Sequence, residues 1–340
     1  MLPIAVTMGE PAGIGGEIVL KAWLGRRAGI PPFYLIDDPD RLASLARQLD
    51  WSAPVCPIDT PDRALAVFGE GLPVKPIGVS IYGRPGCPDS ADAPAILGAI
   101  RTAVCDVRAG KAAAVVTNPI HKDSLYRAGF GHPGHTEYLA ELAGISERPV
   151  MMLVSPELRV VPVTIHLALR QAVERLCTAA IVHAGRVTAA ALRQDFAIAA
   201  PILAVAGLNP HAGEAGALGR EEIGIIEPAV AELLDAGIDV RGPHPADTMF
   251  HAEARRSYDA AVCMYHDQAL IPIKTISFYD GVNTTLGLPF VRTSPDHGTA
   301  FAIAGSGVAR ADSLISALRL AATMAARRFA TTPEPAPNEA

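Results

Sequence analysis

The sequence contains few aromatic residues and no long uninterrupted apolar segment. Phe, Trp and Tyr make up 5% of the 340 residues, whereas hydrophobic residues make up 50%. Ala, Val, Ile and Leu therefore supply most of the apolar side chains, as in parallel α/β sheets that are covered on both faces. No window reaches the roughly 18 consecutive apolar residues that a membrane-spanning helix needs. We therefore expect a soluble α/β protein without membrane association.

The cysteines and the charged residues also lack any concentrated pattern. The five cysteines are scattered without metal-type spacing, and their odd number argues against a disulfide framework. The first residues, MLPIAVTMGEPAG, have no basic segment followed by a long apolar one, as a secretory signal would have. A net charge of -6 gives no electrostatic reason to bind nucleic acid. We expect a cytoplasmic protein that binds neither nucleic acid nor membranes.

Short apolar segments alternate with amphipathic ones, which predicts βαβ units on a parallel sheet. The length suggests two lobes that share a cleft. The segment GEPAGIGGE lies between a predicted strand and a predicted helix, but its glycines match neither a P-loop nor a complete dinucleotide fingerprint. It is interpreted equally as a structural turn or as a ligand-facing loop. Longer helices are predicted at 91–109, 178–192, 220–237 and 311–329, and the Pro-rich tail 331–340 is predicted to be disordered.

Three predicted strands are each followed closely by a histidine. His166 follows VVPVTI, His211 follows ILAVAGLNP, and His266 follows AAVCMY. Residues that leave the same edge of neighbouring parallel strands, about 4.8 Å apart, can converge on one atom. Three imidazoles with an open coordination position form a Lewis-acid site for zinc or a similar divalent ion. The pattern therefore predicts a metal site, although each histidine taken singly is more often structural.

Other polar residues accompany these histidines. Lys274, Asn283 and Arg292 lie in a segment spaced by Gly and Pro, and they suit an anionic, oxygen-rich ligand. Lys274 is also a candidate catalytic residue. Asp247 and Asp267 are candidates for orienting an imidazole or accepting a proton, with loop capping as an equal alternative.

The segment GHPGHTEYL places polar residues at the start of a predicted helix. Thr136 is interpreted either as the helix N-cap or, together with the amide groups around it, as part of an oxyanion site. His132, within this segment, and His121, which precedes it, are interpreted as surface histidines.

Several motifs are long enough to be specific. They are GEPAGIGGE, TNPIHK, GHPGHTEYL, GLNPHAGE, GPHPADTMF, MYHDQALIPIK and GVNTTLGLPFVRTSPDHGTAFAIAG. Together they resemble the 4-hydroxythreonine-4-phosphate dehydrogenase family, NAD-dependent enzymes of pyridoxal 5′-phosphate biosynthesis. The resemblance implies a two-lobed α/β/α fold like that of isocitrate and isopropylmalate dehydrogenases, with the active site in the interlobe cleft. The first lobe would comprise 1–130 and 300–330, and the second 131–299.

The resemblance also implies a homodimer whose active sites draw residues from both subunits. It assigns the divalent metal to the three histidines, with zinc favoured over magnesium, cobalt or manganese, and it implies NAD as cofactor, with NADP as the alternative. The positions that match the family's substrate ligands are His135, Thr136, Lys274, Asn283 and Arg292. The positions that match an adenosine-binding loop are His297, Gly298 and Thr299.

The reaction implied is oxidation of 4-phosphooxy-L-threonine to 2-amino-3-oxo-4-phosphobutanoate, which decarboxylates to 3-amino-2-oxopropyl phosphate. Three alternatives stay open at this point. One is a paralogous dehydrogenase of a four-carbon sugar-acid phosphate, such as threonate or erythronate 4-phosphate. The others are a metal-dependent hydrolase, which needs no NAD, and a non-catalytic module that binds phosphorylated ligands.

Overall fold

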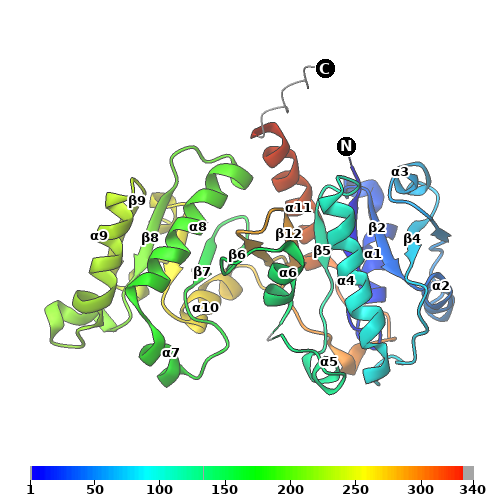
Figure 1. The fold of residues 1–340 in the computed structure, drawn as a ribbon, viewed down its shortest axis with the longest axis horizontal. Helices are drawn as coiled ribbons and strands as arrows, with labels where there is room; N and C mark the ends of the chain where they lie inside the picture. Colours follow the sequence, from blue (N-terminus) through cyan, green and yellow to red (C-terminus); the bar gives the residue numbers. More distant parts are fainter. Residues whose placement is uncertain (1, 133, 332–340) are drawn as a thin grey trace.

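Twelve strands form one continuous sheet in the computed structural model, which describes residues 2–132 and 134–331. The strands are β1 (Ile4–Thr7), β2 (Phe33–Asp37), β3 (Val55–Pro57), β4 (Leu72–Pro76), β5 (Val115–Thr117), β6 (Val150–Val154), β7 (Arg159–Pro162), β8 (Ile202–Ala206), β9 (Asp239–His244), β10 (Ala260–Cys263), β11 (Val282–Leu286) and β12 (Arg292–Pro295). Their order across the sheet is β3-β4-β2-β1-β5-β12-β11-β6-β7-β10-β8-β9. Figure 1 shows the sheet running the length of the molecule.

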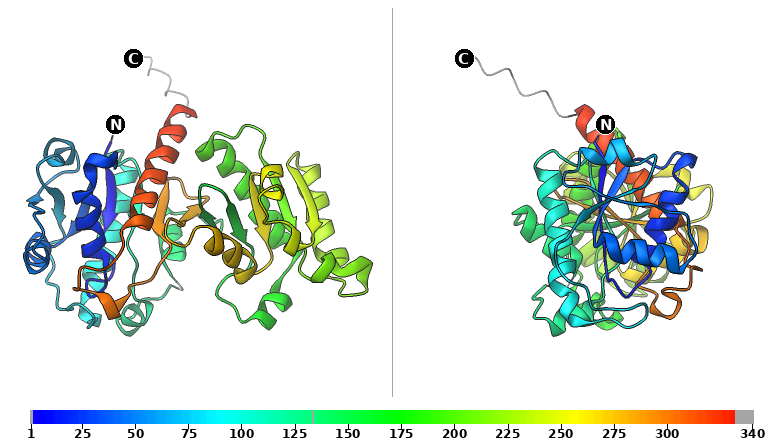
Figure 2. Two further views of the ribbon diagram at one scale, coloured as in Figure 1. Left: turned by 180° about the vertical axis from the view of Figure 1, so that it is seen from behind. Right: turned by 90° about the vertical axis from the view of Figure 1, so that its right-hand side faces the viewer.

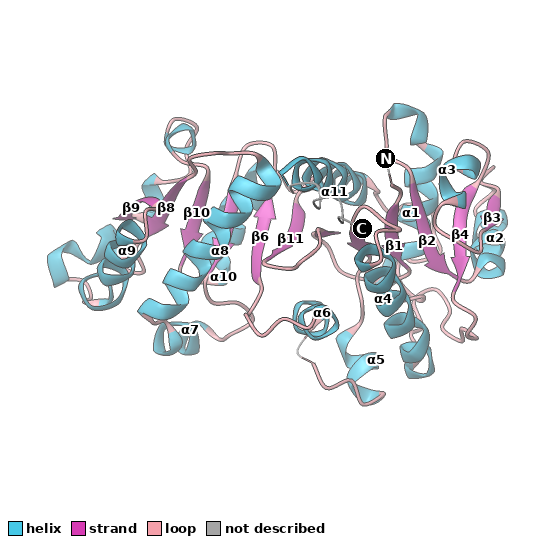
Figure 3. Cartoon of the chain, turned by 45° about the horizontal axis from the view of Figure 1, so that its top comes forward, coloured by secondary structure: helices cyan, strands magenta, loops and turns pink. Residues whose placement is uncertain are grey.

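Helices connect the strands and cover the sheet, as Figure 3 shows. The α-helices are α1 (Gly15–Leu24), α2 (Pro39–Gln48), α3 (Arg63–Val67), α4 (Ala93–Arg108), α5 (Lys122–Arg127), α6 (His135–Ala143), α7 (Leu169–Arg175), α8 (Thr178–Phe196), α9 (Glu227–Asp235), α10 (His266–Ile276) and α11 (Asp312–Thr331). The helices predicted at 91–109, 178–192 and 311–329 are therefore confirmed by α4, α8 and α11. In the described part of the chain, no helix combines the length and apolar character needed to cross a bilayer.

Strand β1 illustrates how both faces of the sheet are buried. Its residues alternate in direction, so Ile4 and Val6 join an apolar cluster that includes residues of α1 and α11. Ala5, between them, joins a different cluster that includes Ile96 and Ile100 of α4. A strand covered on both sides needs apolar residues at every position, which explains the continuous Ile-Ala-Val run. The predicted α/β class is confirmed.

Two blocks of parallel strands run in opposite directions. One block is β3-β4-β2-β1-β5-β12, and the other is β7-β10-β8-β9. Between the blocks, β11 pairs antiparallel with both β12 and β6, and β6 pairs antiparallel with β7. Because these three successive pairings are antiparallel, the strands of the second block run opposite to those of the first. Strands β5 and β10, which belong to different blocks, therefore point in opposite directions.

The two predicted lobes share this sheet. Strand β12 falls in the predicted second lobe, yet it pairs with β5 of the first. Helix α11 packs against β12 and also against α8, and Figure 2 shows it standing between the two halves. The lobe boundaries stay a prediction.

Three local features differ from the sequence-based expectations or fall outside them. Gly134 is the N-cap of α6 and His135 is its first residue, so Thr136 lies in the first turn and does not cap the helix. The helix predicted at 220–237 contains a π-helical turn, η4 (Glu222–Ile226), before α9 begins. From residue 332 onward, the tail predicted to be disordered lies outside the described residues.

Candidate functional site

A cavity of about 530 Å³ lies over the central strands. Its polar lining residues are Thr117, Asn118, Lys122, His135, Thr136, Glu137, His166, His266, Lys274, Asn283, Arg292, Ser294, Asp296 and His297. The structure thus brings all five predicted substrate ligands together with two of the three predicted metal ligands. A larger hollow of about 700 Å³ lies between α11 and the β6–β7 turn. None of the predicted site residues lines it, so the smaller cavity is the candidate site.

Arg292 is a cation buried at the floor of this cavity. Its side chain is 3% exposed, and it donates to the hydroxyl of Thr117 from Nε at 3.2 Å and from Nη2 at 2.6 Å. Its Nη1 donates to the hydroxyl of Thr285 at 2.8 Å. Burial lowers the pKa of Arg292 to about 10. Neutral hydroxyls hold the guanidinium in place without cancelling its charge, which suits it to bind an anion.

His135 lies beside Arg292 and contributes an unsatisfied polar atom. Its Nε2 is buried and has no hydrogen-bond partner in the described chain, although the residue as a whole is partly exposed. Burial, followed by the positive charges of Arg292 and Lys122, holds the pKa of His135 well below its usual range. The ring is therefore neutral at physiological pH. A neutral imidazole in this position can donate to or accept from a ligand oxygen.

Lys274 extends the basic lining from the last turn of α10. Its Nζ lies 3.0 Å from the Asp296 carboxylate and 3.4 Å from the Asp296 carbonyl oxygen. Asn283, on β11, lines the same cavity, and its Oδ1 is buried without a hydrogen-bond partner in the described chain. A buried amide oxygen without a donor is costly, so it marks a position where a ligand hydroxyl or amine fits.

His166 and His266 face each other at the other side of the cavity, with ring centroids 5.9 Å apart. They follow the neighbouring parallel strands β7 and β10, as predicted from strand ends. Burial and the nearby charge of Lys122 lower the pKa of His166. His266 Nδ1 lies 2.7 Å from a carboxylate oxygen of Asp267. When Nδ1 carries the proton, the lone pair of Nε2 is available to bind a metal ion.

His211 does not join this pair within one chain. Strand β8 ends at Ala206, and the intervening residues carry His211 away into the 3-10 segment η3 (Pro210–Gly216), where its side chain is exposed. In residues 2–132 and 134–331, no three His, Cys, Asp or Glu side chains are grouped to hold a metal ion. The three strand-end histidines therefore do not converge within one chain, and the three-histidine metal site stays a prediction.

Three other predicted site residues, Asp247, Asp267 and Thr299, also lie outside the cavity lining. Asp247 is exposed in the 3-10 turn η5 (Ala246–Thr248). Thr299 lies next to the glycine-rich turn, where its carbonyl oxygen accepts the Ile14 N–H at 3.0 Å. A Cβ at Gly13 would approach that oxygen to 2.9 Å. The predicted nucleotide loop and the GEPAGIGGE turn therefore pack directly on each other.

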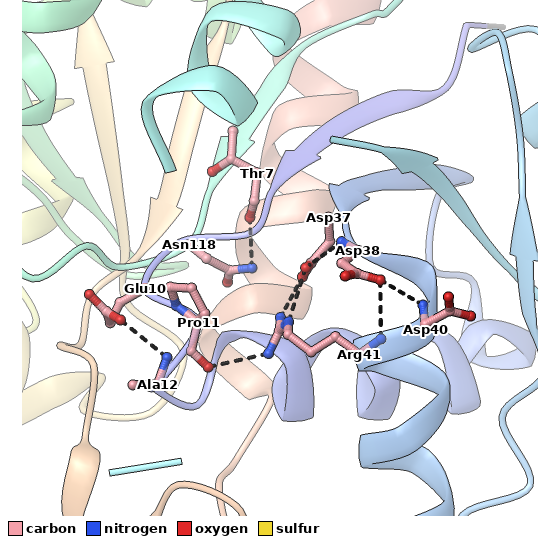
Figure 4. A network of polar contacts seen from close by, with 9 residues as sticks. All are labelled: Thr7, Glu10, Pro11, Ala12, Asp37, Asp38, Asp40, Arg41 and Asn118. Atoms are coloured by element: carbon pink, nitrogen blue, oxygen red, sulfur yellow. Dashed lines mark hydrogen bonds and ion pairs between the residues drawn. The ribbon is translucent and has the colours of Figure 1, made fainter. Parts of the chain in front are cut away.

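The GEPAGIGGE turn also reaches the cavity through Asn118. Asn118 Nδ2 donates to the Thr7 carbonyl oxygen at 3.0 Å, and Glu10 accepts the Ala12 N–H at 3.1 Å (Figure 4). Oxygen atoms of all three side chains, Thr7 Oγ1, Glu10 Oε2 and Asn118 Oδ1, are buried without partners in the described chain. Desolvation raises the pKa of Glu10 to about 7. This turn is therefore polar and buried beside the site.

Sequence reasoning missed six polar residues of the cavity, namely Thr117, Asn118, Lys122, Glu137, Ser294 and Asp296. Asn118 and Lys122 follow β5, and their position after a strand was the signal that could have found them. Glu137 and Asp296 each adjoin a predicted ligand, but neither residue type is distinctive by itself. The cavity lining does not include His121 or His132. His121 Nδ1 lies 2.6 Å from Ser124 Oγ, and His132 pairs with Glu141 at 3.1 Å.

The α/β fold and the basic cavity, which contains the neutral imidazoles of His135 and His166, define an enzyme cleft for a small anionic ligand. The chain belongs to the family described as Pyridoxal phosphate biosynthetic protein PdxA, which matches residues 30–321. It is 57% identical over 338 residues to the 4-hydroxythreonine-4-phosphate dehydrogenase of Bradyrhizobium diazoefficiens, with 96% of this chain and 98% of that protein covered. The predicted family is confirmed. The prediction that the protein is an oxidoreductase is confirmed as well.

Solved structures agree with this assignment. The crystal structure of 4-hydroxythreonine-4-phosphate dehydrogenase from Klebsiella pneumoniae matches with a TM-score of 0.86 and 38% identity, covering 96% of this chain and all of that one (100%). A terephthalate 1,2-cis-dihydrodiol dehydrogenase from Burkholderia xenovorans matches with a TM-score of 0.63 and 29% identity, covering 95% and 98%. The same fold thus occurs in dehydrogenases named for different substrates.

Proposed function

We propose that this enzyme oxidises 4-phosphooxy-L-threonine with NAD, and that the product loses carbon dioxide at the same site. The 3-hydroxyl carbon gives a hydride to NAD and the hydroxyl gives up a proton, leaving 2-amino-3-oxo-4-phosphobutanoate. The carboxyl carbon then leaves as carbon dioxide, its bond electrons pass to an enol, and a proton returns to give 3-amino-2-oxopropyl phosphate. The observation that carries this proposal is the buried Arg292 guanidinium, held by neutral hydroxyls in a cavity with neutral imidazoles.

The basic residues divide naturally between the two anionic ends of such a substrate. Arg292 and Lys122, together with the neutral ring of His135 near both charges, suit the phosphate or the carboxylate. Lys274 suits the other end, while Asp296 holds its ammonium group in place. Fixing both ends sets the position of the reacting carbon, which contributes more to rate than affinity alone. Lys274 is also placed to move a proton at Nζ.

The paired imidazoles fit a divalent metal ion as two of its ligands. His166 is kept neutral by burial, and Asp267 orients His266, so both rings can present a lone pair. Nitrogen ligands favour zinc, with magnesium, cobalt and manganese as alternatives. Such an ion, when bound, lowers the pKa of a hydroxyl and polarises a carbonyl oxygen. His211 is the proposed third ligand.

A second copy of the chain is the proposed source of His211. Large apolar side chains are exposed near each histidine, Leu218 and Ile223 beside the His211 loop, and Leu169 and Ile271 beside the other two. Exposed apolar residues of this kind mark interaction surfaces. A homodimer that covers them would place one subunit's His211 loop at the other's cavity. We propose that Asp247 also acts at the other subunit's cavity, because it is exposed on the same half of the molecule as His211.

The nucleotide is proposed to lie against the 297–299 loop. His297 and Gly298 line the cavity, and the buried Nε2 of His297 lacks a partner in the described chain. Thr299 joins this loop to the glycine-rich turn. We propose NAD as the cofactor, with NADP as the alternative.

One assay tests this function against its alternatives. We expect NADH absorbance to appear with 4-phosphooxy-L-threonine, and to disappear when a chelator is added. Faster turnover of threonate or erythronate 4-phosphate would show that a sugar-acid phosphate is the substrate. A dehydrogenase of similar fold that is named for another substrate makes this comparison necessary. Substrate breakdown without NAD would indicate a hydrolase instead. Repeating the assay with NADP decides between the two nucleotides.

A further inference from the structure

Glu222 is a buried carboxylate whose side-chain hydrogen bonds go to the segment leading to His211. Its side chain is 1% exposed. Oε1 accepts the backbone N–H of Leu208 at 2.8 Å and that of Asn209 at 2.7 Å. Oε2 accepts a hydrogen bond from Nδ2 of the Asn209 side chain at 2.9 Å. Hydrogen bonds to an ionised group are roughly twice as strong as neutral ones, so these three hold the segment firmly.

The segment held in this way has an unfavourable backbone conformation. In η3, φ is 54° at His211, 50° at Ala212, 44° at Glu214 and 52° at Ala215. A left-handed helical conformation costs a non-glycine residue roughly 1–2 kcal/mol. Four such residues in one turn persist only where surrounding contacts determine the conformation. The position of the His211 ring therefore depends on what packs against this turn.

The Glu222 carboxylate occupies the inside of that turn. A Cβ at Gly213, where φ is +79°, would lie 2.6 Å from Glu222 Oε2. A Cβ at Gly207 would lie 3.2 Å from Glu222 Oε1. Glycine at both positions leaves the space that the carboxylate fills. The carboxylate thus contacts the chain before and after His211.

A separate contact fixes where this segment begins. Gln268 Nε2 donates to the Gly207 carbonyl oxygen at 2.8 Å, and Gln268 Oε1 accepts the Met264 N–H at 2.7 Å. Gln268 therefore ties the start of the His211 segment to the turn before His266. Glu222 acts further along, at Leu208 and Asn209, which lead into the left-handed turn.

We propose that Glu222 is a positioning residue that holds His211 in the geometry required for metal binding. This inference rests on the proposed function, in which His211 is a metal ligand. Glu222 does not bind the metal itself, because both of its oxygens accept hydrogen bonds from Leu208 and Asn209. Its effect passes through the backbone. Groups that orient a ligand in this way typically contribute about 10- to 100-fold to metal affinity.

Titration of the metal-free protein with Co²⁺, without substrate, tests this role. Cobalt absorption reports both the affinity and the ligand geometry. We expect Glu222→Gln, which keeps the size of the side chain but loses its charge, to weaken Co²⁺ binding about 10- to 100-fold. Glu222→Ala should weaken it at least as much. The matched control is Glu221→Gln, which loses only one partly exposed contact to Asn209, at 2.8 Å, and should stay within about twofold.

Circular dichroism shows which variants are folded, and the isosteric Glu222→Gln decides the outcome if Glu222→Ala does not fold. Native Co²⁺ affinity and an unchanged cobalt spectrum in Glu222→Gln would overturn the proposal. An equal loss in Glu221→Gln would do the same. His211→Ala separates this inference from the proposed function. If His211→Ala binds Co²⁺ as tightly as the unmodified protein, the metal site itself is wrong, whatever Glu222 does.

Discussion

Arg292 and Thr117 lie on neighbouring parallel strands, and two N–H groups of the guanidinium donate to the one hydroxyl, at 3.2 Å and 2.6 Å. With the Thr285 hydroxyl, this contact orients a buried cation toward the cavity without neutralising it. The planar guanidinium can use its remaining N–H groups on a phosphate or a carboxylate. A lysine ammonium in the same place would be a point charge without that geometry.

Arg292→Lys should therefore weaken the substrate complex although it keeps the positive charge. Loss of a charge-assisted hydrogen bond costs about 1.5–3 kcal/mol, so we expect kcat/KM to fall about 10- to 100-fold. Steady-state kinetics with 4-phosphooxy-L-threonine measures it. Arg47→Lys, at an exposed position of α2, is the control and should leave kcat/KM unchanged. Full activity in Arg292→Lys would rule out Arg292 as an anion ligand.

Glu10 should make the stability of the protein fall as pH rises toward 8. Burial raises its pKa from 4.5 to about 7, so the folded chain binds this proton more tightly than the unfolded chain. The contribution of this bound proton to the free energy of unfolding is complete below pH 4.5 and is lost as pH rises through 7. The loss amounts to at most about 3 kcal/mol. Glu10→Gln removes this dependence. We therefore compare the unfolding free energy of Glu10→Gln with that of the unmodified protein at each pH. We expect this difference to favour the variant more at pH 8 than at pH 5.

Urea unfolding at pH 5 and pH 8 measures the difference. The comparison uses the change in unfolding free energy between Glu10→Gln and the unmodified protein, so that the other titrating groups cancel. Glu70→Gln, at an exposed position, is the matched control and should show no change between the two pH values. A Glu10→Gln effect that is the same at both pH values would mean that the carboxyl is not protonated in the folded state.

Much of this fold could be predicted because its signals are local. Apolar runs predicted the strands, and the amphipathic segments predicted α4, α8 and α11. The pairing of His166 with His266 also followed from local features, because each residue comes directly after one of two adjacent parallel strands. Arg292 and Asn283 were predicted as anion ligands from their donor groups in a segment spaced by Gly and Pro, and the family resemblance named the same positions. Both residues line the cavity.

The rest depended on pairings between distant segments. Lys122 follows β5 of one strand block and lines the cavity with His166 and His266, which follow strands of the other block. No periodicity in the sequence shows that these two blocks contribute to one cavity. His211 lies exposed in a turn where it, Ala212, Glu214 and Ala215 adopt a left-handed conformation that their residue types do not favour. Buried contacts from Glu222 support this conformation, and such contacts are not visible in a linear sequence.

Gly13→Ala should disturb nucleotide binding without touching the substrate ligands. The new Cβ would lie 2.9 Å from the Thr299 carbonyl oxygen, so the backbone of the nucleotide loop must shift. We expect the KM for NAD to rise several-fold while the KM for the phosphorylated substrate stays within twofold. Gly69→Ala, whose Cβ meets nothing within 4 Å, is the control. Equal changes in both KM values would place the effect elsewhere than in the nucleotide loop.

A metal site shared between two copies should permit complementation between inactive variants. In the proposed homodimer, His166 and His266 come from one subunit and His211 from the other. His266→Ala and His211→Ala homodimers should each lack activity, because every site loses a ligand. A mixed dimer concentrates both losses in one site and leaves the second complete.

Co-expression of the two variants with different affinity tags isolates the mixed dimer. An unselected mixture contains half mixed dimers with one complete site each, so it should recover roughly a quarter of the activity expected of the unmodified dimer. The purified mixed dimer should recover about half, and bind about half the metal, because one of its two symmetric sites is whole. If all three ligands came from one chain, no combination of these variants would contain a complete site. An inactive mixed dimer with normal assembly would therefore show that His211 does not act across the interface.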